Sequence, residues 1–107
     1  MKLTIELLRE LCQNRQVLFS VHSLERLQER GIYRKDIVNV IMMGEIIEDY
    51  PDDYPYPSCL IFGASINNQI LHVICGCNGE FITIITAYYP TTDKFEADLK
   101  TRKELKQ

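Results

Sequence analysis

The spacing of apolar residues in the first part of the chain is that of amphipathic helices. Thr4 can cap a first helix in which Leu7, Leu8 and Leu11 fall on one side. Gly31 and Gly44 are natural residues to end the next two helices. The third helix is apolar almost all round and is expected to be the most buried. The predicted helices span residues 5–14, 22–30 and 34–43.

After Gly44 the apolar period shortens to that of strands. Three prolines exclude regular structure in 51–57, and Asn67-Asn68 and Asn78-Gly79 have the composition of two-residue hairpin turns. Residues 17–21 are predicted to form a linker or a brief strand. The other predicted strands span residues 45–50, 58–65, 70–77 and 80–89.

A closing helix is predicted over residues 93–105, because Asp93 and Glu96 have capping-box spacing and Pro90 excludes helix just before them. Helices segregated from a hairpin-connected sheet define the α+β class. We therefore expect N-terminal helices, an antiparallel meander of about four strands and a C-terminal helix. At 107 residues, the whole chain 1–107 is expected to be a single domain.

Two-residue turns would also fix which strand residues share a face of the sheet. The register they imply places Leu60, Leu71 and Val73 on a helix-covered face, together with Thr86 and Tyr88. His72 would then lie among smaller residues on the opposite face, which could be open to a ligand. A bulge in either hairpin would reverse part of this assignment.

Charge is distributed unevenly along the chain, although the net charge is only −3. The segment 45–53 holds five of the 15 acidic residues and no basic one, which leaves 12 basic and 10 acidic residues elsewhere. A local basic site is therefore compatible with an acidic protein. The acidic residues are Glu45, Glu48, Asp49, Asp52 and Asp53.

The cysteines and the N-terminus favour a cytoplasmic location. No apolar run approaches the length of a membrane span, and charges occur too early for a signal peptide. Cys12, Cys59, Cys75 and Cys77 are interpreted as reduced thiols. Strand alternation separates His72 from Cys75 and Cys77, so no metal site is expected. The sequence has no phosphate loop or dinucleotide fingerprint, and we expect no cofactor.

Two histidines and a basic stripe are the candidate chemical groups. His72 is either a packed structural residue or a proton-transfer group, and His22 is either an exposed helix residue or part of a site. On the second predicted helix, His22, Arg26 and Arg30 share a stripe, which would otherwise be a solvated face paired with Glu25 and Glu29. The sequence leaves these alternatives open.

Several segments resemble a bacterial family known as domain of unknown function 4258. The resemblance begins with the run S-V-H-S-L-E-R-L-Q-E-R-G-I at residues 20–32 and covers about residues 20–102. This family is similar in plan to the RelE/BrnT group of toxin ribonucleases, whose members often have small antitoxin partners. The resemblance implies a RelE-like layout and metal-independent RNA cleavage. The further matching segments are 44–51, 56–63, 71–74 and 85–90, with Phe95 and Arg102.

The leading hypothesis is therefore a metal-independent endoribonuclease toxin with RNA as substrate and a small antitoxin as partner. Such a reaction needs a proton acceptor, a proton donor and cations near the phosphate. We predict His72, Arg30 and Tyr88 as catalytic residues, with Tyr89 as an alternative to Tyr88. The predicted substrate-binding residues are His22, Arg26, Arg102 and Thr86. The alternative is a non-catalytic module that binds a partner through the acidic, tyrosine-rich segment 45–56.

Overall fold

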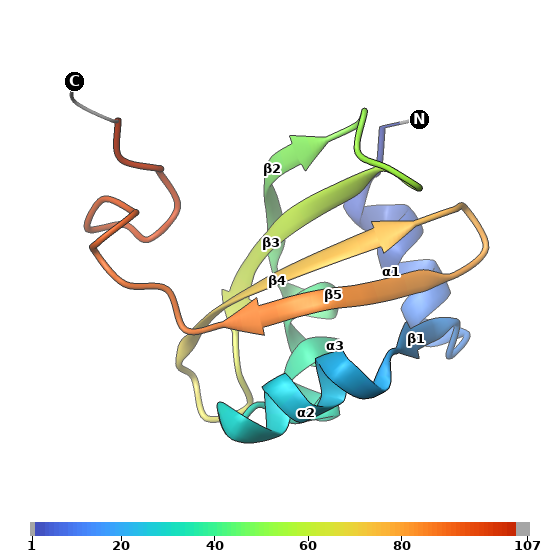
Figure 1. Cartoon of the computed structure of the whole chain (residues 1–107), viewed down its shortest axis with the longest axis horizontal. Coiled ribbons are helices and arrows are strands. Elements are labelled where there is room, and N and C mark those ends of the chain that lie inside the picture. The colour runs from blue at the N-terminus through green and yellow to red at the C-terminus, as the bar shows by residue number, and fades with distance from the viewer. Residues whose placement is uncertain (1, 105–107) are drawn as a thin grey trace.

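The computed structural model describes residues 2–104 and contains, within them, three helices and five strands (Figure 1). Most predicted elements are present with bounds within two residues of those expected. Thr4 caps the first helix as predicted, because its hydroxyl accepts a hydrogen bond from the Leu7 amide. The elements are α1 Ile5–Gln13, β1 Val17–Phe19, α2 Val21–Glu29, α3 Arg34–Met43, β2 Glu45–Tyr50, β3 Ser58–Ala64, β4 Ile70–Cys77 and β5 Ile82–Tyr88.

The sheet has five strands in the order β1-β5-β4-β3-β2 and is mixed rather than purely antiparallel. The predicted strands β2 to β5 form the antiparallel meander. The expectation of about four antiparallel strands is wrong because β1 joins the edge in parallel, with Val17 opposite Ile82. Helices α2 and α3 and the rest of the sheet lie between these two strands in sequence, so only tertiary packing could bring them together.

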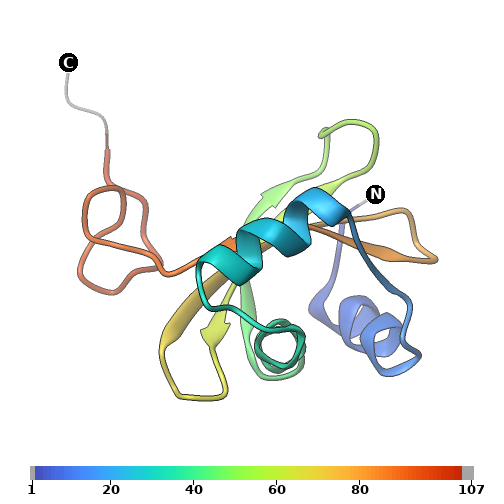
Figure 2. The same ribbon diagram turned by 60° about the horizontal axis from the view of Figure 1, so that its bottom comes forward.

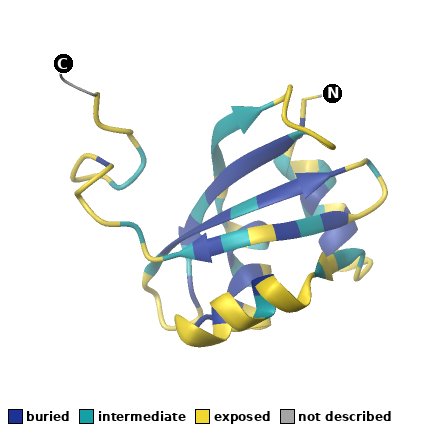
Figure 3. Cartoon of the chain, in the orientation of Figure 1, coloured by how far each residue is buried: buried dark blue, intermediate teal, exposed yellow. Residues whose placement is uncertain are grey.

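Helices α1, α2 and α3 lie on one side of the sheet (Figure 2) and enclose the hydrophobic core. Helix α3 buries Ile37, Val40 and Ile41 completely, as its apolar sequence predicts, but exposes Val38 and Met43 on its outer side. The outer surface of α2 is exposed along its length (Figure 3).

Two glycines end helices for different physical reasons. Gly31 has a φ of +68°, the left-handed conformation expected of a residue just after a helix. Gly44 has a φ of −94°, so the prediction that it ends α3 in the same way is wrong. A Cβ at Gly44 would collide with the carbonyl oxygens of Phe62 and Val40, and glycine is required there by close approach.

The first hairpin has a three-residue loop and not the predicted two-residue turn. Ser65 pairs with Gln69, and Asn68 takes a left-handed φ of 65° inside the loop. The extra residue shifts the register by one, so that Phe62 lies opposite His72. Residues of β3 therefore exchange faces relative to the prediction, and Ile61 faces the helices in place of Leu60.

The second hairpin has a longer loop, from Asn78 to Phe81, followed by a bulge in β5. Before the bulge, Ile82 and Ile84 face the helices as predicted. Beyond it the pairing shifts by one residue, and Tyr88 lies opposite His72. The prediction that these two residues occupy opposite faces is therefore wrong.

The predicted closing helix does not form in residues 93–104, and residue 105 lies outside the described residues. The chain instead makes a small antiparallel turn in which Phe95 bridges to Arg102. The Asp98 carboxylate accepts the amides of Lys100 and Thr101 and closes the tip of the turn. Burial of Phe95, which is 2% exposed, outweighs the weak helical signal of this segment. We call residues 90–104 the C-terminal cover.

Candidate functional site

His72 is completely buried at the start of β4, on the sheet face away from the helices. Three aromatic rings meet the imidazole edge to face. Their centroids lie 6.0 Å away for Phe62, 5.3 Å for Tyr88 and 4.7 Å for Phe95. Phe62 and Tyr88 are its neighbours across the sheet, whereas Phe95 comes from the C-terminal cover. The prediction that this face is open is therefore wrong at this end of the sheet, where the C-terminal cover shields His72 from solvent.

The hydrogen bonds of His72 fix its tautomer. Nε2 lies 2.7 Å from the carbonyl oxygen of Leu99, which can only accept, so Nε2 carries the proton. Burial lowers the pKa of His72, although the Leu99 carbonyl and the Glu48 carboxylate oppose this. In the neutral ring, Nδ1 therefore accepts a hydrogen bond from the Tyr88 hydroxyl, 3.3 Å away.

Tyr88 remains a neutral phenol beside this imidazole. Burial raises the pKa of Tyr88, Arg102 lowers it and Glu48 raises it. A neutral phenol can donate its proton to an oxygen or pass it to Nδ1 of His72. The pair thus provides one donor and one acceptor in direct contact.

Arg102 holds the C-terminal cover against strand β2. Its Nε and Nη2 donate to the two oxygens of Glu48 at 3.1 Å and 3.0 Å, and its guanidinium lies 4.8 Å above the centre of the Phe95 ring. The hydrogen bond from Arg102 lowers the pKa of Glu48, which also accepts a hydrogen bond from the Tyr50 hydroxyl. Burial and this bond to Glu48 raise the pKa of Tyr50 to about 12.

A second ion pair extends this contact. Lys100 lies 3.2 Å from Glu45 and 4.7 Å above the Phe62 ring. Lys2 approaches Asp49 at 3.9 Å. Three of the five residues in the acidic segment therefore have basic partners within the same chain.

An open pocket of about 340 Å³ lies between the end of β5 and the C-terminal cover. Tyr88 lines it, so the hydroxyl-bearing residue of the buried pair contributes to a surface cavity. The pocket combines aromatic rings with both signs of charge. Its lining includes Tyr88, Tyr89, Asp93, Lys94, Phe95 and Arg102.

The structure also brings Arg30 to β5. Arg30 caps α2, and its Nη1 donates to the Thr86 hydroxyl at 3.0 Å and to the Ala87 carbonyl at 2.8 Å. Because Thr86 and Tyr88 are two residues apart on one strand, this pair lies roughly 7 Å along β5 from the Tyr88 position.

His22 and Arg26 remain apart from His72. Both are exposed on α2, and residues 2–104 provide neither side chain with a hydrogen bond or an ion pair. Of the seven predicted site residues, the structure joins His72 and Tyr88 by a hydrogen bond and places Arg102 in the same pocket lining as Tyr88. Arg30 lies with Thr86 nearby, whereas His22 and Arg26 remain on the outer helix.

Sequence reasoning missed the side chains that complete the His72 environment. In the sequence Glu48 stands out only as part of an acidic segment, and the predicted register would place Phe62 with Leu60 on the face opposite His72. Phe95 and Arg102 had a visible signal, since both belong to the segments that resemble the family, but a helix would have arranged them differently. Their convergence depends on the non-helical turn of the cover.

The four cysteines are all buried, and Cys59 and Cys75 approach to 3.9 Å between their sulfur atoms. The hydrogen bond with Cys59, together with burial, raises the pKa of Cys75 well above its usual value. The Cys75 thiol is therefore a poor nucleophile. Cys75 and Cys77 face the helices, on the side opposite His72, as predicted. The described part of the chain holds no group of three residues suited to a metal ion.

Comparison with known protein families assigns the chain to one of them. The family described as "Domain of unknown function (DUF4258)" matches residues 19–89, about two thirds of the sequence, and the chain belongs to this family. His72, Tyr88, Arg30 and Thr86 lie within the matched range, whereas the whole C-terminal cover follows it.

No curated protein and no solved structure matches the chain. Among residues 2–104, no helix has the length and apolar character needed to cross a membrane.

Proposed function

We propose that this protein is a metal-independent endoribonuclease toxin of a bacterial toxin–antitoxin system, with a RelE-like plan. The observation that supports the proposal best is the Tyr88–His72 pair, which joins a buried neutral imidazole to a residue lining a pocket with aromatic and charged side chains. Acid–base groups beside a cation and a pocket are what RNA cleavage without metal needs. The similarity in plan to RelE/BrnT toxins that is expected for this family from the sequence would imply the same activity.

In the proposed reaction, Tyr88 and His72 act together on the ribose 2′-hydroxyl. The 2′-hydroxyl gives its proton to the Tyr88 oxygen while the Tyr88 proton moves to Nδ1 of His72. The 2′-oxygen bonds to phosphorus, and the bond from phosphorus to the 5′-oxygen of the next nucleotide breaks. The proton returns through Tyr88 to the leaving oxygen. The products are a 2′,3′-cyclic phosphate and a free 5′-hydroxyl.

The charged neighbours of the pair match the needs of this step. The Leu99 carbonyl and the Glu48 carboxylate stabilise an imidazolium at His72. Arg102 provides positive charge beside the pocket, and Arg30 at Thr86 adds a second guanidinium further along β5. His72 itself is fully buried, so it acts through Tyr88 and does not meet the substrate.

The Tyr88→Phe variant tests the proposal directly, because it removes the hydroxyl and keeps the ring. We expect RNA cleavage to fall about 10²- to 10⁴-fold with little loss of folding. The assay follows end-labelled messenger RNA in a bacterial translation extract and identifies the terminal phosphate of the fragments. Tyr54→Phe is the matched control, since Tyr54 is 91% exposed in the proline-rich loop.

His72→Gln extends the test, because glutamine retains polarity and some volume but does not titrate near neutral pH. Cleavage should fall by more than the fraction of unfolded protein explains. Wild-type cleavage by Tyr88→Phe, or absence of cyclic-phosphate products from the native protein, would overturn the proposed reaction.

A second candidate is a non-catalytic module that binds a partner through the acidic, tyrosine-rich segment 45–56. The observation that favours it is the exposure of Tyr54 and Tyr56, together with the ability of β2 to hold basic side chains. Lys100 and Arg102 already occupy Glu45 and Glu48. A basic partner segment would therefore compete with the C-terminal cover for the same carboxylates.

An antitoxin that binds in this way would associate more slowly as salt rises, because its target charges are partly exposed. An antitoxin could instead use an acidic segment that mimics RNA and covers the arginines of α2. Its association rate would fall with rising salt in the same way. Stopped-flow association with the product of the neighbouring gene measures it. Association rates that do not change with salt would exclude both electrostatic modes.

A further inference from the structure

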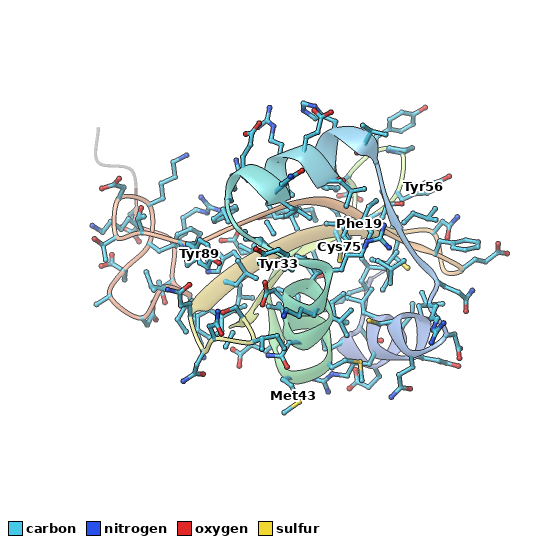
Figure 4. The ribbon with its side chains drawn as sticks, turned by 90° about the horizontal axis from the view of Figure 1, so that it is seen from below. Phe19, Tyr33, Met43, Tyr56, Cys75 and Tyr89 are labelled. Carbon is cyan, nitrogen blue, oxygen red and sulfur yellow. The ribbon has the colours of Figure 1, made fainter. Side chains whose placement is uncertain are left out.

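The pocket between β5 and the C-terminal cover is lined by more aromatic and charged residues than a proton-transfer pair requires. It lies where Tyr89 leaves the sheet (Figure 4), and its volume of about 340 Å³ falls in the range of about 300–1,000 Å³ typical of small-molecule sites. Part of its wall comes from Lys94 and Arg102, in the segment that follows the end of the sheet. A ligand would therefore contact both the sheet and the cover.

One wall of the pocket includes the planar guanidinium group of Arg102. The Arg102 guanidinium stacks on Phe95 at 4.8 Å, and its fork to Glu48 fixes the orientation of the plane. The Arg102 side chain is nevertheless 49% exposed, so the guanidinium is only partly covered. Planar bases stack on such a surface, and Tyr89, which is 36% exposed, supplies a further aromatic side chain.

The polar groups of the pocket have opposite charges. Asp93 and Lys94 both line it, and neither side chain has a hydrogen bond or ion pair within residues 2–104. Nη1 of Arg102 also has no hydrogen-bond partner in that range. A ligand that satisfies these groups needs a planar ring, N–H donors for Asp93 and an anionic group for Lys94 and Arg102.

We propose that this pocket is a nucleotide subsite that selects guanine. Guanine presents two neighbouring N–H donors, N1–H and N2–H, which a carboxylate can accept as a pair, whereas the other RNA bases offer one such group. The base stacks on Arg102, and the phosphate lies toward Lys94. The inference deepens the proposed ribonuclease function by naming a substrate base, and rests on it for its biological meaning. A purely anionic peptide fits less well, because Asp93 would repel it.

Titration of the full-length protein with GMP, AMP, CMP and UMP, followed by amide NMR shifts, tests the subsite. We expect GMP to bind most tightly, with shifts concentrated at Tyr89, Asp93 and Arg102. Tyr89→Ala and Arg102→Lys should each weaken GMP binding at least about fivefold, because lysine keeps the charge but loses the stacking plane. Asp93→Asn should abolish the preference for GMP.

Matched controls lie in the same segment outside the pocket. Glu96→Gln and Lys103→Ala remove one charge each from residues that do not line this pocket, and should leave GMP affinity unchanged. Equal binding of the four nucleotides, or no binding by the native protein, would overturn the inference. GMP binding by a protein that cleaves no RNA would instead refute the ribonuclease and leave a nucleotide site. Cleavage without GMP binding would refute the subsite alone.

Discussion

The helix-covered core and the C-terminal cover stabilise opposite faces of one sheet by different means. Under the helices, contacts are almost entirely apolar, with Leu8, Ile41 and Val73 fully buried. Under the cover, one buried ring, Phe95, is accompanied by ion pairs, cation–π contacts and the hydrogen bond from His72. Figure 3 shows the cover as largely exposed.

These differences have energetic consequences. Burial of one large apolar side chain contributes about 1.5–3 kcal/mol, whereas an exposed ion pair contributes about 0–1 kcal/mol. The core should therefore unfold only globally, and the cover should open locally at much lower cost. The proposed site lies at the boundary between the two, where a rigid sheet meets a displaceable segment.

The largest expected contrast is between Ile41→Ala and Phe95→Ala. Ile41→Ala should lower the free energy of unfolding by about 2–5 kcal/mol, because it leaves a void in the core. Phe95→Ala should cost less globally, since the cover can detach, but should accelerate amide exchange in residues 90–104. Denaturant titration and hydrogen exchange measure the two effects. Equal global losses would show that the cover belongs to the core.

A smaller effect separates two glycines on opposite faces. A Cβ at Gly63 would lie 3.1 Å from the Cα of Val40 on α3, so Gly63→Ala should destabilise the protein by about 1–3 kcal/mol. At Gly76, on the other face, the nearest atom is 3.6 Å away. Gly76→Ala is the control and should change stability far less. A Gly63 variant with native melting temperature would contradict the close helix–sheet contact.

The stability under the cover should also depend on pH through His72. Because burial lowers the pKa of His72 below its usual 6.5, the unfolded chain binds more protons between the two values. This contribution is complete above about pH 6.5 and is lost as pH falls through the folded pKa. His72→Gln should flatten the dependence between pH 7 and 5, as measured by thermal unfolding. An unchanged pH profile in this variant would assign the effect to other groups.

The smallest effect concerns salt. Raising the salt concentration to 1 M should weaken the pairs of Lys100 with Glu45 and Arg102 with Glu48, each by no more than about 1 kcal/mol. Limited proteolysis within residues 90–104 should become faster while the core remains resistant. Lys100→Ala at low salt should reproduce part of this change. If the rate of proteolysis in residues 90–104 does not change with salt, Phe95 and Leu99 alone hold the cover in place.

Local sequence signals determined which elements form. The Thr4 cap, the left-handed Gly31 and the prolines of 51–57 act within a few residues, and they placed the helices and the strands of the meander nearly as observed. Two residues of the site were also indicated locally, because His72 and Tyr88 both lie in segments that resemble the family. Such signals are readable because their physical causes are short in range.

Tertiary structure decided the register, the edge of the sheet and the site. One extra loop residue, with Asn68 left-handed, and one bulge in β5 moved Phe62 and Tyr88 onto the face of His72. Neither change alters the apolar pattern that predicts the strands, so the sequence alone could not reveal them. The C-terminal cover is not the predicted helix, because packing of Phe95 on His72 stabilises this segment more than helical hydrogen bonds would. This packing is available only after the sheet has formed, so the local sequence does not reveal it.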